Sequence, residues 1–452
     1  MNFKESVKSI SKSFIWIVFI LLVFGFCTLT TVDRSSITEQ NFYSQTFLDL
    51  EELSFVKSYG DNWFVGWSKT NMTPKEPVNL VGYAPRGEYE FVSDSSYIKA
   101  LSLSNGESRV AWLNYELLIV HPYLAESIQK KILDSNLPID QVIFTATHTH
   151  SGIGGYIPGA LGAIAFGGLE QETVDLITLE SLKALELAIS KESESRISYR
   201  KSDASDWVSN RFIKDGPTDP YVRQLIITNS SGEKATFFTF SAHATCLSSR
   251  YMGLSGDYPF YLNKELEREG FDFTLFASGA MGSQKPNRPG NTLEDTKKFA
   301  LSLAEDIKLN VKYFRTLNQK SLAFARFDVA LPEPHFRVSD NLRLRPWVFN
   351  WLVGESNAHF DLTKVGNTLF ISSSGEVSGV FYEKWEKIAQ SNGLNLIVTT
   401  FNGEYIGYVV PDELYDKDYH EVREMNWFGP GNGTYFDNLF QMMIKKAGEL
   451  RP

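Results

Sequence analysis

Residues 141–155, QVIFTATHTHSGIGG, hold the pattern from which the fold can be worked out. The apolar, largely β-branched run at 142–144 predicts a buried strand, which leads into His148 and His150 and then into a glycine-rich turn. Side chains two apart in a strand point to the same side, so both imidazoles are expected on one face. Such a pair suits a metal ion or an acid–base site. The alternative is one packed histidine and one solvated histidine.

Composition sets the class of protein and excludes several partners. A chain of 452 residues can bury a large core as one domain or as two, and 43% hydrophobic residues indicate a globular protein. The formal net charge of -10 argues against a nucleic-acid partner, because phosphates require an excess of basic residues. Cys27 and Cys246 are the two cysteines, so we expect neither a disulfide framework nor a cysteine-rich metal site. No feature indicates an obligate protein partner.

The N-terminal segment predicts export. Lys4, Lys8 and Lys12 precede the uncharged, mostly large and apolar residues 14–32, a run at the lower end of a membrane span. Cationic residues before such a run keep the N-terminus in the cytoplasm. We expect residues 1–34 to be an uncleaved signal anchor that attaches an exported domain to the membrane. A cleaved signal peptide, which would give a secreted protein, is the close alternative.

Beyond this segment, we expect a stalk or lead-in at 35–75 and one large domain at 76–452. Strands that alternate with helices predict an α/β fold, and hairpins make its sheets mixed rather than purely parallel. The expected hairpins pair 98–104 with 108–114 and 221–228 with 234–241. Further strands are expected at 272–277, 322–330, 368–373 and 394–400, and helices at 123–134, 171–190, 258–270, 292–313 and 379–391.

Four side chains that zinc can bind each follow an apolar strand. They are His148, His243, Glu376 and one tyrosine of the pair Tyr405 and Tyr408. Strand ends in an α/β sheet converge on one edge, where ligand crevices form. Two imidazoles and a carboxylate make a catalytic zinc set that leaves room for water and substrate. We therefore predict a zinc site at the strand ends, although each residue taken singly could be a satisfied polar group.

The motif THTHSGIGGY at residues 147–156 resembles the HTHSGPGGY-type signature of the neutral, non-lysosomal ceramidases. Other stretches resemble the same family in the same order and make residues 76–452 a ceramidase-like catalytic domain. They are Gly82-Tyr83-Ala84, Asn210-Arg211, Ala242-His243-Ala244-Thr245, Ser255-Gly256-Asp257-Tyr258-Pro259, Ser374-Gly375-Glu376, Tyr405-Ile406-Gly407-Tyr408 and Phe428-Gly429-Pro430.

This resemblance implies a zinc-dependent amidohydrolase that cleaves an N-acyl amide, ceramide or a related lipid, by zinc-activated water. By resemblance, the zinc ligands are His148, His243, Glu376 and Tyr408, with Tyr405 as the fallback for the tyrosine. His150 would face the substrate carbonyl or oxyanion, and Tyr405 is a candidate catalytic residue. Asp257 is either a partner that orients a ligand histidine or a helix N-cap.

The sequence departs from the family in one loop and in length. Ceramidases carry a serine in a GDxSPN-like loop, and the matching residues 282–287 place Lys285 at the serine and Ser283 at the aspartate. Both are candidate catalytic residues, and Lys285 could pair with a carboxylate on the substrate or point to water. By the resemblance, these residues end where ceramidases continue into a C-terminal β-sandwich domain, so we expect the catalytic domain without that second domain.

Two other functions remain open at this point. A catalytically silent relative that binds lipid or envelope components would explain Lys285, but it would not explain why the histidines are retained. A serine hydrolase using Ser283 or Ser378 lacks a GxSxG turn directly after a strand.

Overall fold

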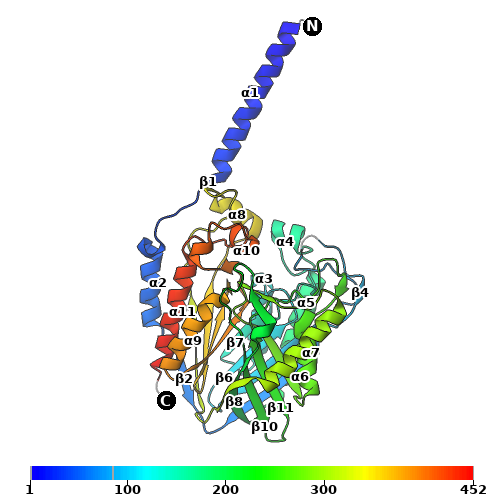
Figure 1. Ribbon diagram of the computed structural model, residues 1–452, viewed down its shortest axis with the longest axis vertical. Helices are drawn as coiled ribbons and strands as arrows, with labels where there is room; N and C mark the ends of the chain where they lie inside the picture. The colour runs from blue at the N-terminus through cyan, green and yellow to red at the C-terminus, as the bar shows by residue number, and fades with distance from the viewer. Residues whose placement is uncertain (1–2, 84–85, 451–452) are drawn as a thin grey trace.

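Two β-sheets stacked face to face form the centre of the molecule, and helices cover both outer faces (Figure 1). The computed structural model describes residues 3–83 and 86–450. The side chains of residues 3–13, 21 and 22 lie outside the described part, and so does Ala84 of the expected Gly82-Tyr83-Ala84 motif. Both sheets contain parallel and antiparallel pairs, so the α/β class with mixed sheets is confirmed.

The larger sheet has the strand order β13-β11-β10-β8-β3-β5-β6-β7, with β15 paired to β8. The hairpins β5–β6 and β10–β11 are antiparallel, whereas β6–β7 and β11–β13 are parallel. Its strands are β3 (Trp63–Asn71), β5 (Tyr97–Ser104), β6 (Arg109–Tyr115), β7 (Gln141–Ala146), β8 (Ser193–Asp203), β10 (Tyr221–Asn229), β11 (Lys234–Phe240), β13 (Phe273–Ser278) and β15 (Val311–Thr316). The helices on its outer side are α3 (Pro122–Ser135), α5 (Gln171–Ser190), α6 (Asp257–Arg268) and α7 (Leu293–Leu309).

The smaller sheet has the order β2-β16-β18-β19-β21. Its strands are β2 (Val56–Tyr59), β16 (Ser321–Asp328), β18 (His359–Val365), β19 (Thr368–Ser373) and β21 (Asn395–Thr400). The helices packed on it are α2 (Asn41–Glu52), α9 (Tyr382–Ser391) and α11 (Asn432–Gly448). Shorter strands form separate pairs: β1 (Leu29–Thr31) with β17 (Leu342–Leu344), β4 (Phe91–Val92) with β12 (Gly253–Leu254), β9 (Val208–Asn210) with β14 (Gln284–Pro286), and β20 (Glu376–Val377) with β22 (Tyr408–Val409).

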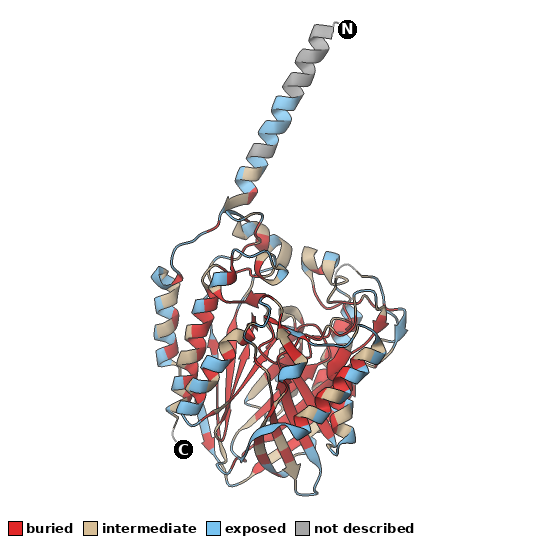
Figure 2. Cartoon of the chain, viewed as in Figure 1, coloured by how far each residue is buried: buried red, intermediate tan, exposed pale blue. Residues whose placement is uncertain are grey.

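Aromatic side chains join the two sheets. Trp112 and Phe237 of the larger sheet both contact Phe370 of the smaller one, with ring centroids 5.0 and 5.3 Å apart. Burying such rings is the main favourable contribution to folding, because each removes a large apolar area from water. Figure 2 shows that the buried residues gather in the sheets and on the inner faces of the helices.

Several elements follow directly from local sequence signals. The hairpin β5–β6 turns at Asn105 and Gly106, and Gly106 has the positive φ of 93° that a tight turn requires. Helix α5 has the expected bounds, because its Leu/Ala periodicity places one apolar face on the sheet. The apolar stretch at Pro346–Val353 is helix α8.

Two segments differ from the expectation. The helix expected at 292–313 ends at Leu309, and Val311–Thr316 pairs with β8, because four of its six residues are β-branched or aromatic and favour a strand. Residues 56–71 of the expected stalk or lead-in are built into both sheets, and β3 lies between β8 and β5. The burial of alternating side chains in β3, among them Trp63 and Val65, explains why it is a central strand.

The N-terminal helix α1 (Phe3–Thr28) projects from the end of the molecule that carries α8 (Figure 1). The side chains of Arg345 and Trp347 donate hydrogen bonds to the carbonyls of Phe26 and Cys27, over 3.2 and 3.1 Å. Across the residues that the structure describes, no helix has the length and hydropathy needed to cross a membrane. The side chains of the lysines that precede the expected anchor at 14–32 lie outside the described residues.

Candidate active site

Strand ends bring the expected ligands together where both sheets end. His148 follows β7 and His243 follows β11, both in the larger sheet. Glu376 and Tyr408 are direct neighbours in the parallel pair β20–β22, which follows strands β19 and β21 of the smaller sheet. The predicted convergence of these residues at one edge is confirmed.

A turn, and not strand alternation, brings the two histidines of the opening motif together. Strand β7 ends at Ala146, and His148 has a left-handed φ of 60°. The rings of His148 and His150 are nevertheless adjacent and nearly perpendicular, with centroids 4.8 Å apart. The expected proximity is thus correct, but its cause is the backbone reversal at His148.

All three histidines of the site have the same hydrogen-bond arrangement. Their Nδ1 atoms lie 2.7, 2.9 and 2.9 Å from the carbonyl oxygens of Leu118, Gly82 and Gln284, for His148, His150 and His243 respectively. A carbonyl only accepts, so each Nδ1 carries the proton and each neutral ring keeps the lone pair of Nε2. Backbone partners of this kind are typical of metal-ligating histidines.

The free Nε2 atoms converge on a carboxylate and a phenol. Glu376 Oε2 lies 3.1 Å from His243 Nε2 and 3.5 Å from His148 Nε2. His150 Nε2 lies 3.2 Å from His148 Nε2, and the Tyr408 hydroxyl lies 2.8 Å from His243 Nε2. Within the described part of the chain, the three histidines form the one group of three or more potential ligands whose atoms all lie within 4.8 Å of one another.

These residues fit zinc by the chemistry of their donor atoms. Zinc binds nitrogen and oxygen ligands of this kind, and the site offers three imidazole nitrogens with available lone pairs, a carboxylate and a phenol oxygen. His148 and His150 direct two lone pairs toward each other across 3.2 Å, an arrangement that a cation between or beside them stabilises. His148 and His243 belong to every ligand set that this arrangement allows, whereas His150, Glu376 and Tyr408 compete for the remaining positions.

Burial controls the protonation of the site. It lowers the pKa of His148 and His150 below the ordinary value and lowers the pKa of His243 to about 3, so the rings are neutral at pH 7. Burial and the nearby Glu376 raise the pKa of Tyr405 and Tyr408 well above 10, so both phenols keep their protons. For Glu376 itself, burial acts to raise the pKa, whereas the Tyr405 hydroxyl, which donates to Oε1, acts to lower it.

Both tyrosines of the expected pair reach the site, with different contacts. The Tyr405 hydroxyl donates to Glu376 Oε1 over 2.6 Å, which fixes the carboxylate, whereas Tyr408 contacts His243. Phe401, which precedes them, stacks on His148 with centroids 4.5 Å apart. Phe401 has no motif around it, so sequence reasoning missed this contact.

The backbone at Gly82 lies very close to His150. Its φ is 104°, and a Cβ at this position would lie 2.4 Å from His150 Cα. Its carbonyl is the one that orients the His150 ring. Arg86 donates to the carbonyls of His150 and Val81, which holds the two segments together.

The loop at 282–287 serves the site through its backbone. Gln284 offers its carbonyl to His243, whereas the Lys285 side chain is exposed on β14. Ser283 is buried, and its hydroxyl accepts from Ser378 over 2.7 Å. Neither Ser283 nor Lys285 is among the residues that line the pocket over the histidines, so their expected catalytic roles gain no support from this geometry.

Asp257 has a structural role that differs from both expectations. Its carboxylate accepts hydrogen bonds from the backbone N–H groups of Cys246 and Leu247, over 3.1 and 2.9 Å. It is the first residue of α6 and not its N-cap, which is Gly256. Asp257 therefore holds the chain that follows His243 and does not contact the ligand ring.

A largely apolar pocket of about 780 Å³ opens above the histidines. Its floor is formed by His148, His150, Glu376, Tyr405 and Tyr408. Its walls come from α4 (Gly159–Ala165), the segment after α8, and the side chains of Phe336, Met425 and Trp427. Such a volume and lining suit an apolar chain attached to a polar reacting group.

Comparisons with known proteins agree with this geometry. The family model described as neutral/alkaline non-lysosomal ceramidase, N-terminal, matches residues 63–297. The neutral ceramidase of Pseudomonas aeruginosa is 25% identical over 188 residues, which are 36% of this chain and 28% of that protein. The alignment thus spans little more than a quarter of the relative's own length.

Two solved structures share the fold. The crystal structure of neutral ceramidase from Pseudomonas aeruginosa has a TM-score of 0.73 at 16% identity and covers 86% of this chain and 75% of that one. A ceramidase complexed with C2 has a TM-score of 0.72 at 16% identity and covers 86% and 76%. With strand ends, site residues and family model in agreement, the chain belongs to the neutral/alkaline non-lysosomal ceramidase family.

Proposed function

We propose that this protein is a zinc-dependent amidohydrolase that cleaves an N-acyl amide lipid, with ceramide as the first candidate. The observation that carries the proposal is a cluster of three Nε2 lone pairs and one carboxylate, in which His148, His150 and Glu376 line an apolar pocket and His243 lies behind them against Glu376. The name of the Pseudomonas aeruginosa relative adds the substrate class.

His148, His243, Glu376 and Tyr408 are the proposed zinc ligands, with Tyr405 as the fallback for the tyrosine. Their contacts with one another support this set, and the resemblance to the family selects it over a set that includes His150. Zinc, when bound, would polarise the amide carbonyl and lower the pKa of a bound water to about 7.

His150 is placed to accept a proton. Its Nδ1 proton is committed to the Gly82 carbonyl, and burial keeps the ring neutral, so its Nε2 carries a lone pair. We assign it the role of taking a proton from the attacking water and returning it to the leaving amine. Donation to an oxyanion, the role that resemblance suggests, is open only to the imidazolium form of the ring.

Tyr405 has two proposed roles, which are to position Glu376 and to donate a hydrogen bond to the substrate. Tyr405 holds one oxygen of Glu376, which leaves the other oxygen directed at His148 and His243. Because burial raises the pKa of Tyr405 and its phenol keeps the proton at pH 7, Tyr405 can donate to an oxygen of the substrate when its present acceptor is displaced.

The pocket entrance supports a lipid substrate. Residues 353–356, at the end of α8 and just after it, line the pocket, and the neighbouring Trp347 and Trp351 are 56% and 70% exposed. Tryptophan side chains favour the interface between water and lipid, because one part is apolar and the other is polar. We assign these two residues to contact with the lipid surface that supplies the substrate. By contrast, Trp63 is buried and Trp67 stacks on Phe273, so these two aromatic residues belong to the core.

The site of action is proposed to lie outside the cytoplasm. This rests on the order of lysines and apolar residues in the first 34 residues. Protease treatment of intact cells would test it, since an exported domain is digested and a cytoplasmic one is protected.

Hydrolysis of a defined amide tests the proposed activity. Zinc-loaded protein is incubated with a fluorescent ceramide in detergent micelles, and released fatty acid is quantified beside a His150→Ala variant and a control variant, Glu107→Ala, at an exposed residue outside the pocket lining. We expect release by the wild type and the control, and a large loss in His150→Ala. A folded, zinc-containing protein that releases nothing from any N-acyl amide would favour the catalytically silent, lipid-binding relative.

A further inference from the structure

His121 connects the active site to the start of helix α3. It directly precedes Pro122, the first residue of α3, and follows soon after Leu118, whose carbonyl holds His148. An extended chain advances at most about 3.6 Å per residue, so the Cα atoms of His121 and Leu118 are at most about 11 Å apart. The residue before a proline favours an extended backbone, and His121 has a φ of -70° and a ψ of 146°. The His-Pro sequence thus favours the N-cap conformation close to the proposed zinc site.

The cap determines which nitrogen of His121 carries the proton. The backbone N–H of Tyr123 donates to Nδ1 over 3.2 Å, so this nitrogen keeps its lone pair. Burial lowers the pKa of His121 to about 4, so the ring is neutral at pH 7 and its proton lies on Nε2. This tautomer is the opposite of the one in the three histidines of the active site, whose protons lie on Nδ1.

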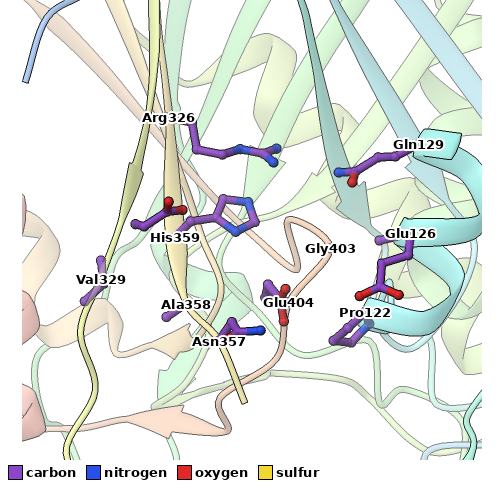
Figure 3. Close-up of a pocket in the computed structure, with 12 residues that line it drawn as sticks. Pro122, Glu126, Gln129, Arg326, Val329, Asn357, Ala358, His359, Gly403 and Glu404 are labelled. Carbon is purple, nitrogen blue, oxygen red and sulfur yellow. The ribbon is translucent and has the colours of Figure 1, made fainter. Parts of the chain in front are cut away.

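The Nε2 edge of the His121 ring faces the apolar pocket. His121 lines that pocket, whereas it does not line the separate polar cavity of about 400 Å³ on the neighbouring side of α3. Figure 3 shows this second cavity, to which Pro122, Glu126 and Glu404 contribute. The Nδ1 edge is turned toward the helix, and within the described part of the chain Nε2 has no hydrogen-bond partner. The wall of the apolar pocket therefore contains a donor that is available to a ligand.

Two hydroxyl donors of the same pocket already have acceptors. Tyr83 donates to the Leu247 carbonyl over 3.0 Å, and Tyr405 donates to Glu376 over 2.6 Å. A ligand that fills an apolar pocket displaces water from its walls, and a donor that then lacks an acceptor is unfavourable. A substrate that presents an oxygen to His121 is therefore favoured over one that presents a methylene group.

We propose that His121 determines specificity by donating a hydrogen bond from Nε2 to a hydroxyl oxygen on the amine portion of the substrate. This inference rests on the proposed amide hydrolysis. A hydrocarbon acyl chain offers no acceptor besides the amide carbonyl, which the reacting centre engages, so the acceptor belongs to the amine portion. The substrate class is thereby narrowed from N-acyl amides to N-acyl amino alcohols. Because the cap and Pro122 hold the ring in place, the donor is preorganised.

A matched pair of amides that differ by one hydroxyl group tests the inference. The probes are N-octanoyl-2-aminododecan-1-ol and N-octanoyl-2-aminododecane, presented in the same detergent micelles to the zinc-loaded, full-length protein. We expect the wild type to have a kcat/KM about tenfold to a hundredfold higher for the alcohol, because the amide without the hydroxyl leaves a buried donor unpaired.

The variant His121→Ser keeps a capping hydroxyl and removes the donor, so we expect it to hydrolyse the two amides at similar rates. A purely structural effect on α3 would lower both rates and leave their ratio unchanged. The control is Lys131→Ala, which alters an exposed residue of the same helix outside the pocket lining and should keep the wild-type ratio.

A second measurement requires no turnover. Long-range nitrogen–proton NMR correlations of protein labelled at its histidines, assigned with His121→Ser, report which ring nitrogen is protonated, and we expect Nε2 for His121. A proton on Nδ1, equal rates of the wild type for both amides, or a wild-type ratio in His121→Ser would overturn the inference and leave the hydrolase proposal intact. A folded, zinc-loaded wild type that hydrolyses neither amide would reject both proposals.

Discussion

The Nε2 atoms of His148 and His150 lie 3.2 Å apart, while the other nitrogen of each ring donates to a backbone carbonyl. In the neutral rings that burial favours, this brings two lone pairs face to face. Such a contact is unfavourable unless a cation or a proton lies beside it. The orientation of these two rings is therefore the feature that most directly links the fold to metal binding.

The contact between Gly82 and His150 predicts that the methyl group added in Gly82→Ala strongly reduces activity. In Gly82→Ala the new Cβ would meet His150 Cα at 2.4 Å, so the ring must move. We expect kcat/KM for amide hydrolysis to fall about a hundredfold, because misplacement of a reacting group by about 1 Å has that effect. The matched control is Gly232→Ala, which has a similar φ of 92° but no atom within 4 Å. Equal activity of the two variants would contradict the positioning role of Gly82.

We expect substitution of Tyr408 to weaken zinc binding and substitution of Tyr405 to slow catalysis. Tyr408→Phe removes the phenol next to His243 and should weaken zinc binding, measured by competition with a chelator. Tyr405→Phe removes the 2.6 Å hydrogen bond to Glu376, and we expect kcat to fall about tenfold to a hundredfold with zinc retained, since bonds to charged groups contribute about 1.5–3 kcal/mol. If Tyr405→Phe lost more zinc than Tyr408→Phe, Tyr405 would be the zinc ligand and Tyr408 would be the tyrosine that supports catalysis.

His121 is expected to make stability depend on pH. It is the N-cap of α3, its Nδ1 accepts from Tyr123 N, and burial lowers its pKa to about 4. The unfolded chain, with a pKa near 6.5, binds a proton first as the pH falls, so this stabilisation is present above pH 6.5 and is lost toward pH 4.

The variant His121→Asn keeps a capping side chain and does not titrate. Between pH 7 and pH 5, we expect the wild type to lose about 2 kcal/mol of unfolding free energy relative to this variant, measured by urea denaturation. Parallel pH profiles for the two proteins would show that His121 is solvated in the folded state.

Local signals were sufficient for much of the fold. The Leu/Ala periodicity of residues 171–190 predicts α5, and the turn at Asn105-Gly106 predicts the β5–β6 hairpin. Both elements depend on residues that are near neighbours in the sequence. The sequence does not predict strand β8, because all of its residues except Ile197 and Tyr199 are polar or charged although it lies in the middle of the larger sheet. Its place is decided by pairing with β10 and β3, which no local pattern encodes.

The ligands were predictable, but the groups that orient them were not. Histidines and carboxylates after strands stand out by residue type, whereas the carbonyls of Leu118, Gly82 and Gln284 are backbone groups that every residue possesses. The loop at 282–287 is an example. The family comparison singles out the side chain of Lys285, whereas the group that contacts His243 is the backbone carbonyl of Gln284.

The exposed tryptophans of α8 predict a dependence on how the substrate is presented. Trp351 is 70% exposed, so Trp351→Ala should leave stability nearly unchanged. We expect its rate to fall severalfold with ceramide in vesicles and to match the wild type with a water-soluble short-chain amide. Leu133→Ala, which alters a 77% exposed leucine outside the pocket lining, is the control. Equal rates of Trp351→Ala and Leu133→Ala on vesicles would contradict the proposed contact between α8 and lipid.

The metal content of the purified protein tests the central claim most directly. It would be measured for the wild type, His148→Ala, Glu376→Ala and the exposed control His420→Ala, with folding checked by circular dichroism. We expect about one zinc per chain in the wild type and the control, and little in the two ligand variants. A folded wild type without zinc, or ligand variants that retain it fully, would contradict the proposed site.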